Sequence, residues 1–253
     1  MNFSGVSNKG VIGRLLRLPL KLIPDKAVVP ILQGPLQGKR WIAGSSSHGC
    51  WLGSYEFSKQ KIFIEHVSEG QIVYDIGAHV GFYTLLSSQL VGTTGQVIAF
   101  EPFPPNVAYI QRHIILNDLK NVKLIQKAVS NRYDQVTFQI ANSSSMGHLA
   151  EGKISGDSII VDTIALDQFI SDEGLPLPDV VKVDIEGAEF DFLQGARNLF
   201  ESRSIKLFLA THGSDVHSSC VTFLQEMGYE VVSLEDKPLH LSSEIFAAKP
   251  NLR

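Results

Sequence analysis

Short apolar runs that alternate with helical patterns are the feature of this 253-residue chain that most limits its fold. Residues 72–76, 97–100, 180–184 and 205–210 each form such a run. Runs of this length between turn signals are typical of strands that are buried on both faces. Strands that alternate with helices predict an α/β fold, an open and mostly parallel sheet with helices on both faces. Because ligands bind beyond the carboxyl ends of such strands, we expect the functional residues directly after each run.

The remaining segments fit the same alternation. The spacing of apolar residues and the turn signals predict helices and further strands between the four runs. The expected helices cover 82–90, 104–117, 189–200 and 216–227, the further strands 122–129, 136–140 and 159–164, and a closing hairpin 229–234 and 245–248.

The composition bounds the class of protein. Hydrophobic residues make up 44% of the chain and charged residues 19%, which excludes disordered, collagen-like and coiled-coil proteins. The two cysteines, Cys50 and Cys220, lack the spacing of a metal site or a disulfide framework. No apolar stretch reaches the roughly 18 residues of a membrane span, and the N-terminus lacks the pattern of a signal peptide. We therefore expect a cytoplasmic protein.

Charge divides the chain into an N-terminal extension or cap, 1–70, and a domain, 71–253, that holds the four apolar runs. The extension holds nine lysines and arginines against four acids, whereas the rest holds thirteen against twenty-two. Apolar residues at helical spacing over 11–23, with Arg14, Arg17 and Lys21 on another face, predict an amphipathic helix. Such a helix fits contact with a membrane surface or a substrate cap, and it equally fits docking on the domain with its cations in solvent.

The cofactor is predicted from the end of the first run, which carries Asp75, and from the loop after it, which carries Gly77 and Gly81. This D-x-G-x-x-x-G pattern differs from the G-x-G-x-x-G fingerprint of dinucleotide sites, and Asp75 would repel a pyrophosphate. An acid suits S-adenosylmethionine, which carries an ammonium and a sulfonium but no phosphate. The glycines let the backbone approach a ligand closely, and Glu101, after the second run, is placed to accept hydrogen bonds from both ribose hydroxyls.

Acids also lie at the end of the run at 180–184 and directly after it. Asp184 and Glu186 project to one side while the chain is extended, and we expect both to lie near the methyl acceptor. Glu189 shares a face with Glu186 once a helix begins, but an acid at a helix start is also favourable to the helix dipole. Three close carboxylates are compatible with Mg²⁺ or another hard cation. Clustered acids alone do not establish a metal, so the metal dependence stays open.

Methyl transfer to a hydroxyl requires removal of the acceptor proton by a base or by a metal. His212 follows the run at 205–210 and fits a general base with a pKa near the working pH, or a histidine bonded to a loop carbonyl. His148 lies in a segment rich in serine and glycine and fits either an acceptor-covering loop or an exposed position. The predicted catalytic residues are Asp184, Glu186 and His212.

The segment from Val73 to Thr84 resembles the first motif of the FkbM family of S-adenosylmethionine-dependent methyltransferases. Similar segments are GQVIAFEP at 95–102, Asn117, KVDIEGAE at 182–189 and LGSYE at 52–56. The similarity covers about residues 50–235, and KVDIEGAE is its most specific part.

The resemblance implies a Rossmann-like class I methyltransferase sheet of seven strands, of which the last is antiparallel. It also implies O-methylation of a hydroxyl on a sugar, a glycolipid or a polyketide-type metabolite. Two positions depart from the family pattern, because Ala210-Thr211-His212 lacks the acid that often precedes the histidine, and His79 replaces a common Asn. The implied cofactor contacts are Asp75, Gly77, Ala78, His79, Gly81, Thr84 and Glu101.

Other function classes fit less well. A nucleotide-dependent oxidoreductase or epimerase would carry a Tyr-x-x-x-Lys pair, which Tyr109 and Tyr229 do not form. Methyltransferases of base amino groups carry an Asn/Asp-Pro-Pro-aromatic turn where this chain has DIEG at 184–187, and an acidic mouth would repel phosphates. We therefore expect a small-molecule or glycan acceptor and no nucleic acid. A peptide or amine acceptor, or cofactor binding without catalysis, stays an alternative, and the sequence leaves the oligomeric state open.

Overall fold

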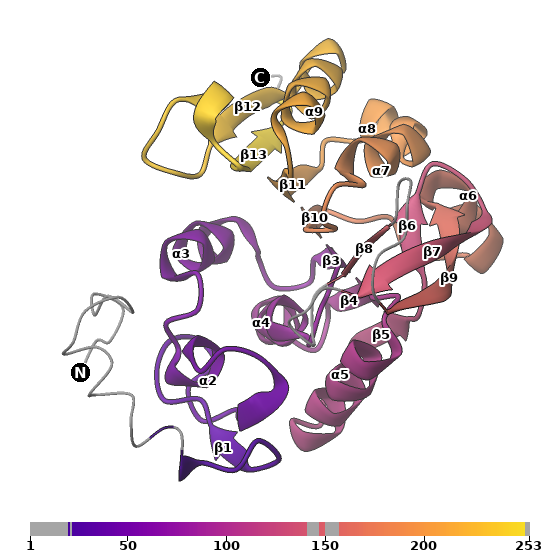
Figure 1. Cartoon of the computed structure of the whole chain (residues 1–253). Coiled ribbons are helices and arrows are strands. Elements are labelled where there is room, and N and C mark those ends of the chain that lie inside the picture. Colours follow the sequence, from indigo (N-terminus) through magenta and orange to yellow (C-terminus); the bar gives the residue numbers. More distant parts are fainter. Residues whose placement is uncertain (1–19, 21, 141–146, 150–156, 251–253) are drawn as a thin grey trace.

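The centre of the molecule is a seven-stranded sheet (Figure 1). The computed structural model describes residues 20, 22–140, 147–149 and 157–250. The strand order is β12-β13-β11-β10-β3-β4-β5, and β13 is the one described strand of this sheet that runs opposite to the other six. This arrangement confirms the expected sheet with an antiparallel last strand. The strands are β3 (Ile72–Ile76), β4 (Gln96–Phe100), β5 (Val122–Ile125), β10 (Val180–Val183), β11 (Lys206–Ala210), β12 (Glu230–Ser233) and β13 (Glu244–Ala248).

The interior strands are buried on both faces because side chains alternate between the two sides of a strand. Tyr74 and Ile76 of β3 point into one core. Apolar residues of the helices over 166–173, 189–195, 197–202 and 214–226 complete this core. Val73 points into the opposite core, which contains Phe82 of α4 (Phe82–Val91) and Phe63 of the N-terminal segment. The apolar runs of the sequence therefore contribute side chains to two cores, one on each face of the sheet.

The register of the central strands determines where the site can form. Ile76 of β3 pairs with Phe100 of β4 on one side and with Val183 of β10 on the other. The three strands thus end at the same level. Gly77 and Asp184, each directly after its strand, consequently lie at one edge of the sheet.

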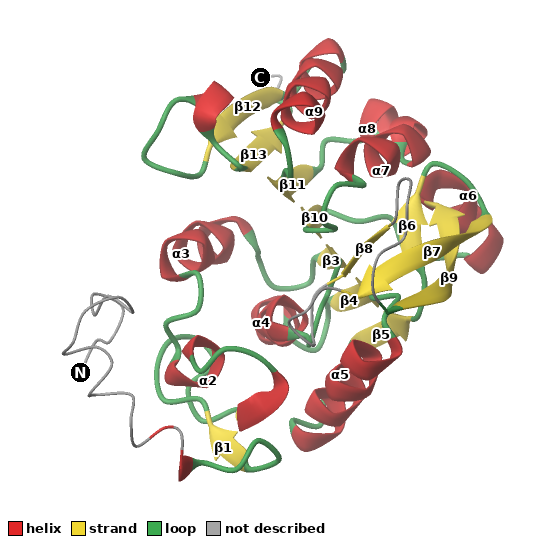
Figure 2. Ribbon diagram, viewed as in Figure 1, coloured by secondary structure: helices red, strands yellow, loops and turns green. Residues whose placement is uncertain are grey.

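Helices cover both faces of this sheet (Figure 2). The expected helix over 189–200 is in fact two helices, α7 (Glu189–Gly195) and α8 (Arg197–Ser202), which meet at Ala196. The main helices are α4 (Phe82–Val91), α5 (Pro104–Leu116), α6 (Leu166–Glu173), α7 (Glu189–Gly195), α8 (Arg197–Ser202) and α9 (Ser214–Glu226), and a short turn, η3 (Leu239–Leu241), precedes β13.

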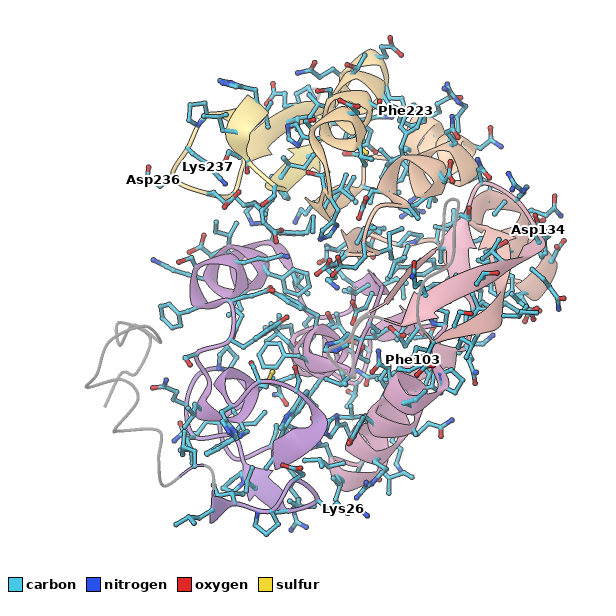
Figure 3. The ribbon with its side chains drawn as sticks, viewed as in Figure 1. Lys26, Phe103, Asp134, Phe223, Asp236 and Lys237 are labelled. Carbon is cyan, nitrogen blue, oxygen red and sulfur yellow. The ribbon has the colours of Figure 1, made fainter. Side chains whose placement is uncertain are left out.

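A second, four-stranded sheet is inserted between β5 and α6. The expected single strand over 122–129 is split between the two sheets, because the chain turns away from β4 after Ile125. Phe103, labelled in Figure 3, lies at the start of α5. Its ring stacks on Phe138 of this sheet, with 5.9 Å between the ring centroids. The strands are β6 (Ala128–Ser130), β7 (Asp134–Ile140), β8 (Gly147–Leu149) and β9 (Ser158–Ala165).

The described part of the N-terminal segment packs against α4 and α5. Trp41 stacks on His113 of α5 at 3.9 Å between ring centroids, and the backbone N–H of Ile42 donates to His113 Nε2 at 3.1 Å. The division at residue 70 stays a prediction, and most of the amphipathic segment 11–23 lies outside the described residues. The elements are β1 (Val28–Pro30), β2 (Arg40–Ile42), η2 (Ala43–Ser45), α2 (Gly49–Leu52) and α3 (Phe57–His66).

Among the described helices, none has the length and apolar character that crossing a bilayer requires.

Candidate functional site

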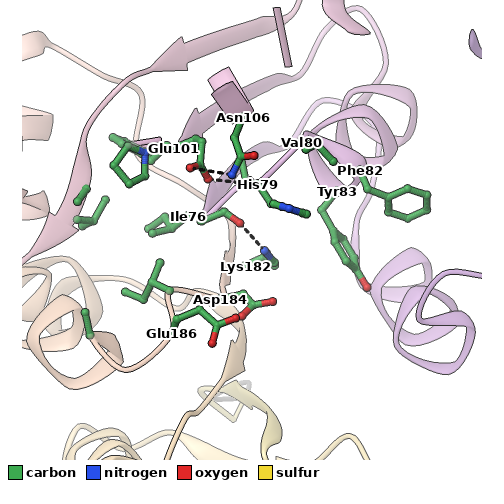
Figure 4. Close-up of a pocket in the computed structure, with 18 of the residues that line it drawn as sticks. Ile76, His79, Val80, Phe82, Tyr83, Glu101, Asn106, Lys182, Asp184 and Glu186 are labelled. Atoms are coloured by element: carbon green, nitrogen blue, oxygen red, sulfur yellow. Dashed lines mark hydrogen bonds between the residues drawn. The ribbon is translucent and has the colours of Figure 1, made fainter. Parts of the chain in front are cut away.

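A cavity lies at the carboxyl edge of β3, β4 and β10 (Figure 4). Its walls come from the loops after these strands, from β6 and β7 of the second sheet, and from the N-terminal segment. Six predicted site residues line it, and these are Gly77, Ala78, His79, Glu101, Asp184 and Glu186. Four others lie around it without lining it, namely Asp75, Gly81, Thr84 and His212.

The loop between β3 and α4 is held against both neighbouring strands. The backbone N–H groups of Gly77 and Ala78 each donate to the carbonyl oxygen of Phe100, at 3.0 Å. Gly77 has a φ of +74°, and a Cβ atom at this position would collide with the backbone carbonyl of Asp184. Gly81 has a φ of +90° and precedes α4 directly. Glycine is therefore required at Gly77 both by conformation and by lack of space.

Asp75 lies behind the cavity wall with no exposed surface. Its Oδ2 accepts a hydrogen bond of 2.6 Å from the Thr84 hydroxyl, and its Oδ1 lies 3.5 Å from the Lys182 ammonium, which also donates to the Gly77 carbonyl at 3.0 Å. Burial lowers the pKa of Lys182, but the charges of Asp75 and other carboxylates outweigh burial and raise it. We expected the negative charge of Asp75 to face the cofactor. Lys182 instead balances this charge, and the same ammonium holds the glycine loop through the Gly77 carbonyl.

Glu101 faces the cavity with only 4% of its surface exposed. It accepts hydrogen bonds from the backbone N–H of His79 at 2.8 Å, from that of Phe103 at 3.0 Å and from the Asn106 side chain at 3.3 Å. Burial raises the pKa of Glu101 to about 7, although these hydrogen bonds oppose the shift. Asn106 also lines the cavity, and the sequence carried no signal for it.

Asp184 and Glu186 lie on the opposite side of the cavity from Glu101 (Figure 4). Glu186 has a φ of +55° and Gly187 one of +110°, so the chain turns sharply before α7. Burial raises the pKa of Asp184, but the positive charges of Lys182, Lys59 and His212 outweigh it and hold that pKa below its usual value. Asp184 is therefore ionised at neutral pH.

His212 is surrounded by three carboxylates. Its Nδ1 lies 2.7 Å from Glu189 Oε1, and its Nε2 lies 3.5 Å from Glu186 Oε2 and 3.8 Å from Asp184 Oδ1. The hydrogen bond to Glu189 and the three negative charges raise the pKa of His212 to about 9, against the effect of burial. This value differs from the near-neutral pKa that we expected for a general base. The partner of the ring is also a carboxylate, not a loop carbonyl.

The same cluster bears on metal binding. Asp184, Glu186 and His212 each offer one potential ligand atom, and these atoms all lie within 4.8 Å of one another. The sequence predicted a possible set of three carboxylates that included Glu189. The structure has His212 in place of Glu189, because Glu189 is turned toward His212. A cation would have to compete with the proton that the carboxylates keep on His212.

The N-terminal segment contributes cavity residues that the sequence analysis did not assign. Ser46, Cys50 and Tyr55 line the cavity beside Tyr83 of α4. Burial raises the pKa of the Cys50 thiol to about 12, so this cysteine is not a reactive thiolate. Tyr55 could have been predicted only from its place in LGSYE at 52–56, one of the segments that resemble the family.

Lys59 anchors this wall to the last strand of the sheet. Its ammonium, only 8% exposed, lies 2.7 Å from Glu244 Oε2 of β13 and 3.6 Å from Glu56 Oε2. Tyr83 donates a hydrogen bond of 2.9 Å to the same Glu56 oxygen. The N-terminal segment is thus tied to β13 through the buried Lys59 and to α4 through the half-buried Glu56.

Comparison with known proteins adds an independent observation. The family model described as "Methyltransferase FkbM domain" matches residues 75–231. The chain is 26% identical over 145 residues to the hexuronic acid methyltransferase AglP of Haloferax volcanii, a match that covers 56% of each chain. It is 26% identical over 162 residues to the 2-O-methyltransferase NoeI of Sinorhizobium fredii, which covers 57% of this chain and 63% of the other. The matches thus span little more than half the length of these relatives.

A solved structure shares the fold. The crystal structure of the methyltransferase FkbM from Methylobacillus flagellatus superposes with a TM-score of 0.50 at 16% identity. The alignment covers 74% of this chain and 50% of that chain. The class I methyltransferase sheet expected from the sequence is thereby confirmed.

Proposed function

The chain belongs to the FkbM methyltransferase family, and on that premise we propose that it transfers a methyl group from S-adenosylmethionine to a hydroxyl oxygen. The observation that carries this proposal is the arrangement of carboxylates in one cavity, with Glu101 on one side and Asp184 and Glu186 on the other. All three follow strands of the central sheet, where this class of fold binds its ligands.

The residues present fit the cofactor in charge and in space. Glu101, buried and already held by two backbone N–H groups, is placed to accept hydrogen bonds from the ribose hydroxyls. The absence of a side chain at Gly77 leaves the loop backbone at the cavity wall. The ionised Asp184 and its neighbour Glu186 favour a ligand with positive charge. When bound, the cofactor supplies a methyl group on a positively charged sulfur.

The chain must then position an acceptor hydroxyl and remove its proton. In the transfer a carbon–oxygen bond forms, the carbon–sulfur bond breaks with its electron pair left on sulfur, and the hydroxyl proton goes to a base. Asp184 and Glu186 line the cavity and are placed to hydrogen-bond the acceptor. His212, whose Nε2 lies 3.5 Å from Glu186, is the proposed proton acceptor in its neutral form. Much of the acceleration then comes from orientation.

The proposed acceptor is a sugar hydroxyl, free or in a glycolipid or related metabolite. Two relatives are named as a hexuronic acid methyltransferase and a 2-O-methyltransferase, which supports this class. The rings of Tyr55 and Phe82, 5.0 Å apart, add apolar surface to a cavity that also carries carboxylates.

Calorimetry with S-adenosylhomocysteine tests the cofactor. We expect binding by the folded protein and a loss of roughly 10- to 100-fold in affinity for Glu101→Ala, as for removal of a charged hydrogen-bond partner. Glu173→Ala, an acid at the exposed end of α6, is the matched control and should bind as the wild type does. Absence of binding, or equal affinity in Glu101→Ala, contradicts the proposal.

Transfer of a labelled methyl group to a panel of acceptors tests the reaction. The panel should contain neutral glycosides, uronic acid glycosides, a peptide and an amine. A methyl ether survives alkali whereas a methyl ester is hydrolysed, so alkali treatment of the product separates hydroxyl from carboxyl acceptors. Turnover of only the peptide or the amine would favour that alternative, and tight cofactor binding with no turnover would favour binding without catalysis.

A further inference from the structure

Glu189, the first residue of α7, has no exposed surface although it carries a carboxylate. An acid at a helix start usually remains in solvent, where it interacts with the helix dipole. Burial of a carboxylate is costly unless hydrogen bonds compensate it. Glu189 Oε1 accepts the backbone N–H of Gly187 at 3.0 Å and lies 2.7 Å from His212 Nδ1. The buried position therefore goes with two specific partners, and a role at the helix dipole alone does not explain it.

These two contacts join loops from different parts of the chain. Gly187 belongs to the turn after β10 that carries Glu186, and His212 belongs to the turn after β11. The 2.7 Å between Glu189 Oε1 and His212 Nδ1 is the length of a charge-assisted hydrogen bond, which is stronger than one between neutral groups. Glu189 thus fixes the turn that carries Glu186 and the ring of His212 at the same oxygen atom.

The other side of the His212 ring faces the cavity carboxylates. Its Nε2 lies 3.5 Å from Glu186 and 3.8 Å from Asp184, which is longer than an ordinary hydrogen bond. The His212 side chain keeps 36% of its surface exposed, whereas Glu189 keeps none. A ligand beside the two cavity carboxylates can therefore approach the ring but not the acid behind it.

We propose that Glu189 is a positioning residue that holds the Nδ1–H tautomer of His212, so that Nε2 is the nitrogen turned to the acceptor side of the cavity. A buried carboxylate that accepts from one imidazole nitrogen orients the ring and leaves the other nitrogen for proton transfer. The geometry of Glu189 stands by itself. The consequence that Nε2 takes the acceptor proton rests on the proposed function.

The tautomer is measurable without an acceptor or turnover. Two-bond ¹H–¹⁵N correlation spectra of the ¹⁵N-histidine-labelled full chain with S-adenosylhomocysteine should be recorded at a pH where the ring is neutral. We expect the Nδ1–H tautomer for His212 in the wild type. In Glu189→Ala we expect the Nε2–H tautomer that a free imidazole prefers. An Nε2–H tautomer in the wild type, or an unchanged tautomer in Glu189→Ala, overturns the proposal.

A conservative variant covers the case in which Glu189→Ala does not fold. Glu189→Gln keeps the size of the side chain and a carbonyl oxygen at the same place. We expect it to keep the tautomer with a weaker bond, so that the Nδ1 proton resonance moves upfield. Glu186→Gln, which alters the Nε2 side, is the control and should leave the Nδ1 resonance in place. An Nδ1 resonance that does not move in Glu189→Gln also overturns the proposal.

The kinetic consequence separates positioning from a purely structural role. With an acceptor that is turned over, and at a pH where His212 is neutral in both proteins, Glu189→Gln should lower kcat with little change in KM or in affinity for S-adenosylhomocysteine. Glu189→Ala should lower kcat further, by roughly 10²-fold or more. An equal loss in kcat and cofactor affinity would indicate a structural role. If no acceptor is found, the tautomer result still decides the positioning role, so the two proposals fail separately.

Discussion

The backbone carbonyl oxygen of Asp184 lies against the α-carbon of Gly77, so the loops after β10 and β3 meet where no side chain fits. The contact joins two walls of the cavity, the wall that carries Asp184 and the wall that carries the glycine loop. Any change that separates the two loops should therefore affect both stability and cofactor binding.

Gly77→Ala tests this contact. The added Cβ must displace the Asp184 backbone at a φ of +74°, so we expect a loss of about 2 kcal/mol or more in the free energy of unfolding, with weaker binding of S-adenosylhomocysteine. Gly174→Ala is the matched control, because Gly174 has a φ of +59° with no atom within 4 Å of the added Cβ. Urea unfolding and calorimetry should show a clearly larger effect at Gly77, and equal losses would show that the contact is unimportant.

The pH dependence of turnover should follow His212. Its pKa of about 9 means that the neutral ring, which can accept a proton, becomes abundant only as the pH rises toward 9. We expect kcat/KM to rise by up to about tenfold per pH unit between pH 7 and 9 and then to level off. Glu189→Gln removes the negative charge of the hydrogen-bond partner and should shift the rise to lower pH, while His212→Asn should abolish it. A flat profile in the wild type would exclude His212 as the base.

His113 should make the docking of the N-terminal segment sensitive to acid. Burial lowers its pKa to about 4 from the ordinary 6.5, although a hydrogen bond to the Val80 carbonyl opposes the shift. The folded protein thus favours the neutral ring, so this stabilisation is complete above about pH 6.5 and is lost as the pH falls toward 4. The full shift corresponds to about 3 kcal/mol.

Urea unfolding between pH 7.5 and 4.5, followed by tryptophan fluorescence, measures this loss, because Trp41, one of the two tryptophans, stacks on His113. His113→Gln is the reference, since its amide cannot take up a proton in this range but can still accept from the Ile42 N–H. The difference in pH dependence between the two proteins isolates His113, and identical slopes would show that its protonation is not linked to folding.

Chelation distinguishes a protein base from a metal at the same cluster. Because three carboxylates keep a proton on His212, we expect that removal of divalent metals with EDTA changes turnover less than twofold. The measurement is the rate before chelation, after it, and after addition of Mg²⁺ or Mn²⁺. A loss that either ion restores would assign Asp184, Glu186 and His212 to a metal site instead.

The strand ends could be predicted because they depend on local sequence. Buried parallel strands require apolar β-branched runs, and their carboxyl ends must lie at one edge, so Gly77, Glu101 and Asp184 were expected together and do line one cavity. Their roles toward a cofactor and an acceptor stay predictions. The helix over 189–200 and the strand over 122–129 were less well predicted, because the breaks at Ala196 and after Ile125 depend on packing against other elements.

Local sequence patterns did not predict which charged side chains contact each other. Asp75 was expected to meet a cationic ligand, but it meets Lys182, which is its partner on the neighbouring strand β10. From its position Glu189 fitted an acid at a helix start, but it is buried against His212, which lies 23 residues later in the chain. Ser46 and Tyr55 enter the cavity because the N-terminal segment folds back over α4.

The sequence by itself determined the sheet, its reversed last strand and the edge at which the candidate site lies, because these follow from apolar periodicity, from glycines that tolerate positive φ and from the motifs that carry the resemblance. Only the tertiary structure decided the electrostatics of that edge. The pKa of His212 depends on Glu189, Glu186 and Asp184 lying within 4 Å of its ring. Distances of this kind are set by how β10, β11 and α7 pack, and no pattern along the chain encodes them.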